Sequence, residues 1–210
     1  MKNLYFPVFA AMLVVLPVWA HDESSTSATV RSPVVLASFP TKPEQFQSDV
    51  RPFVERIITR YGEEEWNTVV LVHELHRHLG TFSILGAKMG VRARELLGAS
   101  LDDLSVESHA GLIPPMSCFN DGLQVSTGAS LGRGTIRVTN GAPPVPEAIF
   151  IFGKKRLRLR VKSDVFQRAQ DSMRKIRSDM YSPEARRASL EAWAEFDRHE
   201  IFEETTEVKP

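Results

Sequence analysis

Three of the six histidines in this 210-residue sequence lie within one hexapeptide, HELHRH, which begins at residue 73. Zinc proteases place histidines four residues apart on a helix, and the spacing here is different. On a helix, His73 and His76 would share a face, whereas an extended segment or a loop would point His76 and His78 to the same side. Two neutral imidazoles arranged in the second way can bind zinc, copper, nickel or iron.

A single cysteine, Cys118, excludes an intrachain disulfide and every zinc motif that needs paired cysteines. Asp121 follows three residues later, so a helix would place the thiol and the carboxylate on one face. A thiol at a helix N-terminus has a lowered pKa, which favours metal binding or nucleophilic attack. Two histidines, Cys118 and Asp121 could provide four metal ligands, or three ligands and an open position for water. Spacing alone also allows a buried, inert cysteine and histidines with ordinary hydrogen bonds.

The composition is that of a globular protein without an excess of either charge. The 26 Lys and Arg residues balance 26 Asp and Glu residues, which excludes a generally basic nucleic-acid binder and an acidic tail. Hydrophobic residues make up 42% of the chain and charged residues 25%, which argues against global disorder. The length suits one domain or two small ones.

The first twenty residues have the pattern of a secretory signal peptide. Lys2 supplies a positive charge, residues 4–18 carry no charge, and Val18 and Ala20 place small residues before a cleavage site. The apolar stretch is shorter than the roughly 20 residues that span a bilayer, and an uncleaved anchor is the alternative. We expect a signal peptide over residues 1–20, a flexible leader rich in Ser, Thr and Pro over 21–43, and a single domain over 44–205. The mature protein would be periplasmic or secreted, without a stable membrane span.

The elements that must position the candidate residues follow from the apolar spacing. Three segments that end at glycines are predicted to be helices: 48–61, 81–97 and 117–127. Residues 66–75 could form a buried strand or a helix. Three segments are predicted to be strands, with a tight turn at Asn140-Gly141 after the first: 135–139, 148–152 and 156–161. Two helical patterns, 164–180 and 183–198, precede a polar tail. The expected fold class is α+β, with helices packed on a central antiparallel sheet.

Two glycines inside the predicted helix 81–97 indicate a packing role. Gly86 and Gly90 are four residues apart, so one stripe of the helix has almost no side chain. Each glycine costs about 1 kcal/mol of helix propensity relative to alanine. We expect another element to approach the backbone closely along this stripe.

Other polar groups are expected to be structural. Arg156, Arg158 and Arg160 would lie on the exposed face of a sheet. Glu107 and His109 would belong to a solvated loop. An exposed strand edge could pair with the same edge of a second chain and so form a homodimer.

Two blocks of the sequence resemble the FmdE family of formylmethanofuran dehydrogenase proteins. The first reads HRHLG from residue 76 and LGAKMG from residue 85, and is similar to that family's H-G-H-L-x-P and L-G-x-R-M-G signature. The second reads SCFNDGLQVSTGASLGRG from residue 117 and is similar to S-C-x-x-D-G-I-Q-x-x-T-G-C-T-x-G-K-G. The resemblance extends from about residue 66 to residue 161.

This resemblance implies an α+β domain that holds a metal, often zinc, where the His-x-His turn meets the cysteine-containing segment. Carried over by position, His76, His78 and Cys118 would be metal ligands, and Asp121 would bind the metal directly or support a ligand. Arg77 replaces a glycine of the family pattern, and Gly80 stands at a position that is cysteine in many members. Exposed amides at the start of the following helix would favour a small anionic ligand.

The expected function is therefore that of an exported metal-binding protein, with zinc as the expected metal. A metal-dependent periplasmic enzyme that uses Asp121 as a base at the same site is the first alternative. A structural envelope domain that has lost the metal is the second. No nucleic-acid partner is expected.

Overall fold

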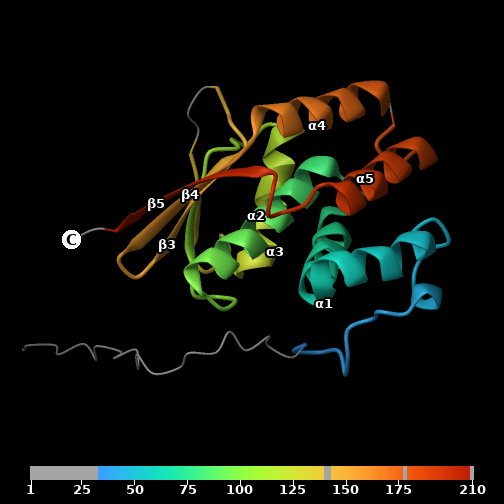
Figure 1. The fold of residues 1–210 in the computed structure, drawn as a ribbon, viewed down its shortest axis with the longest axis horizontal. Coiled ribbons are helices and arrows are strands. Elements are labelled where there is room, and N and C mark those ends of the chain that lie inside the picture. Colours follow the sequence, from blue (N-terminus) through green and yellow to red (C-terminus); the bar gives the residue numbers. More distant parts are fainter. Residues whose placement is uncertain (1–32, 140–142, 177–178, 209–210) are drawn as a thin grey trace, which may run out of the picture.

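A five-stranded sheet carries helices on one of its faces, and helix α2 runs through the middle of the helical layer (Figure 1). The computed structural model describes residues 33–139, 143–176 and 179–208. The expected signal peptide, residues 21–32 of the expected leader and the Asn140-Gly141 turn lie outside these residues. The α+β fold class is confirmed.

The described helices and strands follow one another in mixed order along the chain. The helices are α1 (Arg51–His76), α2 (Thr81–Leu97), α3 (Phe119–Thr127), α4 (Ser163–Ile176) and α5 (Pro183–Glu195). Two short 3-10 helices are η1 (Pro43–Gln45) and η2 (Met116–Cys118). The strands are β1 (Ser105–Ser108), β2 (Ile136–Val138), β3 (Glu147–Phe152), β4 (Lys155–Val161) and β5 (Phe202–Val208). None of the described helices is long and apolar enough to cross a membrane.

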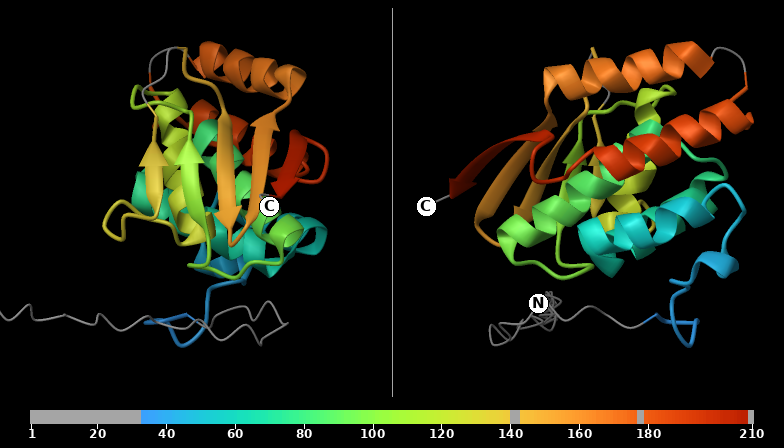
Figure 2. Two further views of the ribbon diagram at one scale, coloured as in Figure 1. Left: turned by 90° about the vertical axis from the view of Figure 1, so that its left-hand side faces the viewer. Right: turned by 45° about the vertical axis from the view of Figure 1, so that its right-hand side comes forward.

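The sheet is mixed, which corrects the expected antiparallel sheet. Its strand order is β2-β1-β3-β4-β5, and β1 pairs with β2 in parallel whereas the other pairs are antiparallel. The connection from β1 to β2 contains α3, and parallel neighbours need a long crossover of this kind. Figure 2 (left) looks onto the open face of the sheet, with the helices behind it or beyond its ends.

Two of these strands were not expected from the sequence. β1 has four residues, Ser-Val-Glu-Ser, which are too few and too polar to show alternation. β5 was expected to be a polar tail, but it pairs with β4 along its length, with Val161 opposite Phe202 and Lys155 opposite Val208. An edge strand tolerates polar residues because one side of it faces solvent.

Helix α1 contains both the first predicted helix and the ambiguous segment 66–75. Gly62 interrupts it with φ 86° and ψ 164°, so a kink separates the two halves. Beyond the kink, the side chains of Trp66, Val69 and Val72 are fully buried at helical spacing, so this segment is a helix. The ring of Trp66 stacks on that of Trp193 from α5, with centroids 4.7 Å apart.

Helices α2 and α3 approach each other closely at their glycines, which confirms the packing role expected for Gly86 and Gly90. An added Cβ on Gly86 would lie 2.1 Å from the Phe119 carbonyl oxygen, and one on Gly90 would lie 1.8 Å from Ser126 Oγ. Gly122 of α3 faces α2 in turn, since its Cβ would lie 2.3 Å from the Ser83 carbonyl oxygen. The two backbones therefore touch, and the start of α3 is fixed against α2.

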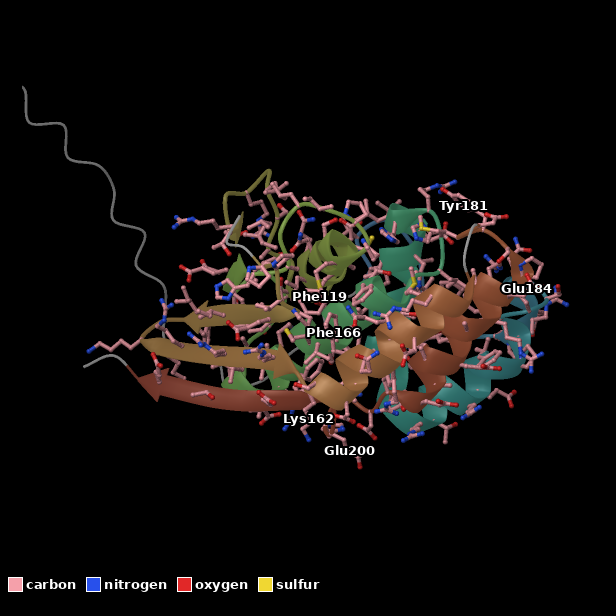
Figure 3. All side chains as sticks on the ribbon, turned by 90° about the horizontal axis from the view of Figure 1, so that it is seen from above. Phe119, Lys162, Phe166, Tyr181, Glu184 and Glu200 are labelled. Carbon is pink, nitrogen blue, oxygen red and sulfur yellow. The ribbon has the colours of Figure 1, made fainter. Side chains whose placement is uncertain are left out.

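The core has two parts, on opposite sides of α2. One part lies between α2 and the sheet and includes Leu85, Phe119 and Phe150. Phe166 of α4 packs against this cluster, and Figure 3 labels it where the helices meet the strands. The other part lies among α1, α2 and α5 and includes Trp66 and Trp193.

A buried group of charges also links the helices and was not predicted from the sequence. Lys88 and Glu65 are both fully buried and form an ion pair. Glu65 also pairs with Arg198 at 3.0 Å, and Lys88 Nζ lies 3.9 Å from the centre of the Tyr61 ring. Burial lowers the pKa of Lys88 to about 8, although the Glu65 carboxylate opposes this effect.

Candidate metal centre

The two closely spaced histidines are brought together by a left-handed residue at the end of α1. His76 is the last residue of the helix, and Arg77 follows with φ 66° and ψ 5°. This turn reverses the chain, so the His78 ring lies against the His76 ring with centroids 4.1 Å apart. The pair is thus formed by a helix C-terminal turn and not by an extended segment.

Asp121 of α3 holds His76 from the opposite side. Asp121 Oδ2 lies 2.7 Å from His76 Nδ1, although the two residues are 45 positions apart in the chain. Since the carboxylate accepts this hydrogen bond, Nδ1 carries the proton and Nε2 is the nitrogen left for another partner. His76 Nε2 is buried and has no hydrogen-bond partner among the described residues.

Cys118 lies at the same place, where η2 passes into α3. It is the N-cap residue of α3, it is partly buried, and its thiol is free. The Asp121 carboxylate that accepts from Nδ1, followed by the nearby Cys118 side chain, raises the pKa of His76 to about 9. The structure therefore brings together His76, His78, Cys118 and Asp121, the four residues selected from the sequence.

The pKa of His78 is shifted in the opposite direction from that of His76. Burial, followed by the charge of His76, lowers the pKa of His78 below its usual value. The His78 ring contacts that of Tyr181 at 5.7 Å between centroids. Figure 3 shows Tyr181 at the end of the helical layer that is remote from the strand tips. A neutral imidazole at residue 78 has a nitrogen lone pair available for a metal.

Gly80 packs directly against His76. An added Cβ on Gly80 would be 3.3 Å from His76 Nε2 and 3.1 Å from Ser83 Oγ. The position at which many proteins of the resembling family carry cysteine is therefore adjacent to the unpaired nitrogen of His76.

His73 supports this turn and is not part of the group. Its Nε2 accepts the Gly80 N–H at 3.3 Å, and its side chain is buried. Burial, followed by the charge of His76, lowers the pKa of His73 to about 3, so the imidazole is neutral. Residue 73 therefore fixes the segment between α1 and α2, a role that its spacing in the sequence did not reveal.

Of the two residues expected on a solvated loop, Glu107 belongs to the sheet and His109 directly follows strand β1. Glu107 lies in β1, 3.4 Å from the Arg156 guanidinium, and His109 Nδ1 lies 2.7 Å from Glu147 Oε1 of β3. The register of β4 places Arg160 opposite Glu203 and Arg156 opposite Glu207 of β5. These arginines of β4 thus face carboxylates of β5 on the open face of the sheet, where they were expected.

The donor set suits a transition metal of borderline softness. Two imidazoles, one thiol and a carboxylate are ligand types of zinc sites, and the buried Nε2 of His76 has no other use among the described side chains. In the part of the chain that the structure describes, no three His, Cys, Asp or Glu side chains already form a metal-binding group. A metal would therefore have to draw the side chains closer together.

The fold and the site define an α+β domain with a His-x-His turn facing a cysteine at a helix start. The family model of FmdE, described as molybdenum formylmethanofuran dehydrogenase operon, matches residues 75–207. This match covers more than half of the chain and includes all four candidate residues. The chain belongs to the FmdE family.

A shorter stretch of the sequence is similar to part of a longer archaeal protein. Over 65 residues, 30% of this chain, the sequence is 35% identical to a probable S-adenosyl-L-methionine-binding protein of Archaeoglobus fulgidus. The matched stretch covers 18% of that protein, so the similarity is limited to one segment of a longer chain.

Proposed function

We propose that this FmdE-family chain is an exported protein that holds a transition metal, zinc, through His76, His78 and Cys118. The observation that carries the proposal is the buried Nε2 of His76, which has no hydrogen-bond partner in the described structure and lies beside the other two residues. Leaving a buried polar atom unpaired costs about 1–3 kcal/mol, and a bound metal would remove that cost.

Asp121 supports a ligand in this proposal. Histidines that bind metals commonly donate their second ring N–H to a carboxylate, which fixes the ring and strengthens the other nitrogen as a ligand. The 2.7 Å contact between Asp121 Oδ2 and His76 Nδ1 has this form. Because this oxygen is already engaged, the contact favours holding a metal over acting as a general base.

Metal binding would displace protons and move side chains. His76 carries a proton at neutral pH when its pKa is about 9, so a metal must compete with that proton. The His78 ring lies against that of His76 at a tilt of 38°, and a rotation of the His78 ring is the movement that would turn a nitrogen toward a shared ion. When bound, zinc would act as a structural ion or as a Lewis acid, according to whether a position stays open.

Export rests on the sequence of residues 1–20. A charged start, an uncharged apolar stretch and small residues before the cleavage site are typical of secretory signals. Expression of the full chain in a Gram-negative host, followed by mass measurement of the periplasmic fraction, tests this part. A product that begins at residue 21 is expected, and a full-length product in the cytoplasm would contradict export.

Elemental analysis of the purified protein tests the metal. We expect about one zinc per chain in the wild type, and strongly reduced zinc in His78→Ala and Cys118→Ser. His109→Ala is the matched control, because that imidazole pairs with Glu147 on the sheet and should leave the zinc content unchanged. A metal-free wild type, or full zinc content in both site variants, would overturn the proposal.

A further inference from the structure

A cavity of about 580 Å³ lies on the side of His78 that faces α5 and the segment before α1. Its volume is within the range of small-molecule sites. Its wall is formed by residues 45–47, 50 and 51, by the end of α1 with the turn that follows, and by Arg186 and Trp193 of α5. Much of this wall precedes residue 75, so it lies outside the segment matched by the FmdE family.

Positive charge dominates this wall. Three arginines line the cavity, Arg51, Arg77 and Arg186, against one carboxylate, Glu74. Arg186 is held by Asp49 through two contacts of 2.6 and 2.9 Å. In the described structure, Arg51 and Arg77 have no carboxylate partner, and each makes a single hydrogen bond to a backbone carbonyl, of Phe46 and Glu74 respectively.

Arg77 occupies a backbone conformation that disfavours it. With φ 66°, the residue is in the left-handed region, where a side chain costs roughly 1–2 kcal/mol relative to glycine. Its side chain nevertheless lines the cavity. The turn conformation does not favour arginine at residue 77. We attribute the arginine to the positive charge that it adds to the cavity wall.

The apolar part of the wall offers a further unpaired group. Phe46 and Trp193 line the cavity, and Trp193 is 1% exposed. The indole Nε1–H of Trp193 is buried and has no hydrogen-bond partner in the part of the chain that the structure describes. Buried indole N–H groups usually have an acceptor, which a ligand could supply.

We propose that this cavity binds a small organic anion, with a carboxylate or phosphate group held by Arg51 and Arg77 and a planar apolar group against Phe46 and Trp193. Guanidinium groups bind both anions through paired N–H donors, so the two chemistries share one set of contacts. The site shares the His78 side of the turn with the metal centre, but it uses other atoms and does not depend on a metal.

Titration calorimetry on the purified, metal-free chain tests the proposal with three probes: phenyl phosphate, benzoate and benzyl alcohol. Saturable binding of one molecule of either anion is expected, without binding of the uncharged alcohol. The tighter of the two anions identifies the preferred group. No saturable binding of either anion to the wild type would overturn the proposal.

The variants separate this site from the surface charge and from the metal centre. Arg51→Gln and Arg77→Gly are each expected to weaken binding about tenfold, because each removes one charged hydrogen-bonding partner. Arg187→Gln is the matched control, since Arg187 lies next to Arg186 but pairs with Glu191 on the exposed side of α5. Undiminished binding in the Arg51→Gln/Arg77→Gly double variant would also overturn the proposal.

Two controls keep these results interpretable. Arg77→Gly is expected to unfold at the wild-type temperature or above it, because glycine adopts the left-handed conformation without strain. A loss of binding in a stable protein is then due to the lost guanidinium. Cys118→Ser is expected to bind the anion as the wild type does, so a failure of the metal proposal would leave this one intact. Weaker anion binding in Cys118→Ser would contradict a separate site.

Discussion

One imidazole, that of His76, joins helix α3 to the turn that follows α1. Its Nδ1 contacts Asp121 on α3, its ring lies against that of His78 at a tilt of 38°, and its Nε2 lies beside Gly80. The side chain of His76 is only 9% exposed, so solvent does little to satisfy its second nitrogen. The chemistry of the site therefore depends on what this nitrogen meets.

Asp121→Asn tests how far the carboxylate prepares His76 for a metal. The amide can keep a hydrogen bond to Nδ1 but loses the charge, so zinc affinity is expected to fall about 10–100-fold. Competition with a chromophoric chelator measures this. Asp164→Asn, at the exposed start of α4, is the control and should bind zinc normally. Equal affinity in Asp121→Asn and the wild type would show that the carboxylate does not tune the site.

His73 gives the stability a defined pH dependence. Its pKa is about 3 in the folded chain against an ordinary value of 6.5, so below pH 6.5 the unfolded chain binds a proton that the folded chain does not. This contribution to stability is complete above pH 6.5 and is lost as the pH falls toward 3, by up to about 1.4 kcal/mol per pH unit.

His73→Gln isolates this effect, because glutamine can still accept the Gly80 N–H but does not titrate in this range. Urea unfolding at pH 7 and at pH 5 should show a smaller loss of stability in the variant than in the wild type. Equal losses in the two proteins would mean that residue 73 is not responsible.

At the residue scale, the sequence was sufficient to select the four candidate site residues. It was not sufficient to predict the role of each residue around them. His76, His78, Cys118 and Asp121 lie together as the two motif blocks suggested. The role of His73 depends on a hydrogen bond to a residue in the next turn, and no spacing rule encodes that contact. The left-handed conformation of Arg77 was equally hidden, because arginine rarely adopts it.

At the element scale, the contact between α2 and α3 determines where Cys118 and Asp121 lie. The two helices meet backbone against backbone at Gly86 and Gly122, and Gly90 leaves room for the Ser126 side chain. Any side chain at these positions has to push α3 away from α2. The distance between the α3 residues and His76 would change with it.

Gly86→Ala is therefore expected to destabilise the fold by about 3 kcal/mol, because its methyl group would overlap the Phe119 carbonyl. Thermal unfolding and zinc content should fall together. Gly132→Ala is the control, since an added Cβ at this position meets nothing within 4 Å. A Gly86→Ala protein as stable as Gly132→Ala would contradict the close backbone contact.

Element prediction succeeded where the apolar period was long and failed where elements were short or polar. The expected helix 81–97 coincides with α2, and the expected strand 156–161 lies within β4. β1 has only four residues, and β5 is mostly polar, so neither carries an alternation strong enough to detect. The expected end of a helix at Gly62 appears in the structure as a kink, and a second helical half follows it directly within α1.

At the scale of the whole molecule, buried charges tie α1 and α2 to the segment after α5. Lys88 and Glu65 are fully buried, and Arg198 bridges Glu65 and Glu95. Removing one member of a buried pair leaves the other charge without compensation. Such a network restricts how the C-terminal segment can pack on the helices.

Lys88→Met is expected to lower the free energy of unfolding by about 3 kcal/mol, because Glu65 loses its buried partner. Adding Glu65→Leu should recover part of this loss, since Arg198 keeps Glu95 as a partner. Chemical unfolding of the two variants measures both effects. A double variant less stable than Lys88→Met would show that Glu65 is needed for Arg198 more than for Lys88.

The sequence predicted the α+β class of the whole chain but not its topology. The order of helical and strand patterns was sufficient for the class. The parallel pair of β1 and β2 depends on which strands become neighbours after the chain has crossed α3, and local periodicity carries no such information. The ion pair of Lys88 and Glu65 likewise joins residues 23 positions apart on two helices.

Replacing Gly80 with cysteine would place a second thiol near His76. The backbone of residue 80, at φ −133° and ψ 128°, is one that any amino acid adopts, and the atoms nearest to a new Cβ are the ends of the Ser83 and His76 side chains. Glycine and cysteine codons can differ by a single base. If the proposed metal site exists, this one exchange would add a thiol beside His76 and would require only the ends of the Ser83 and His76 side chains to shift.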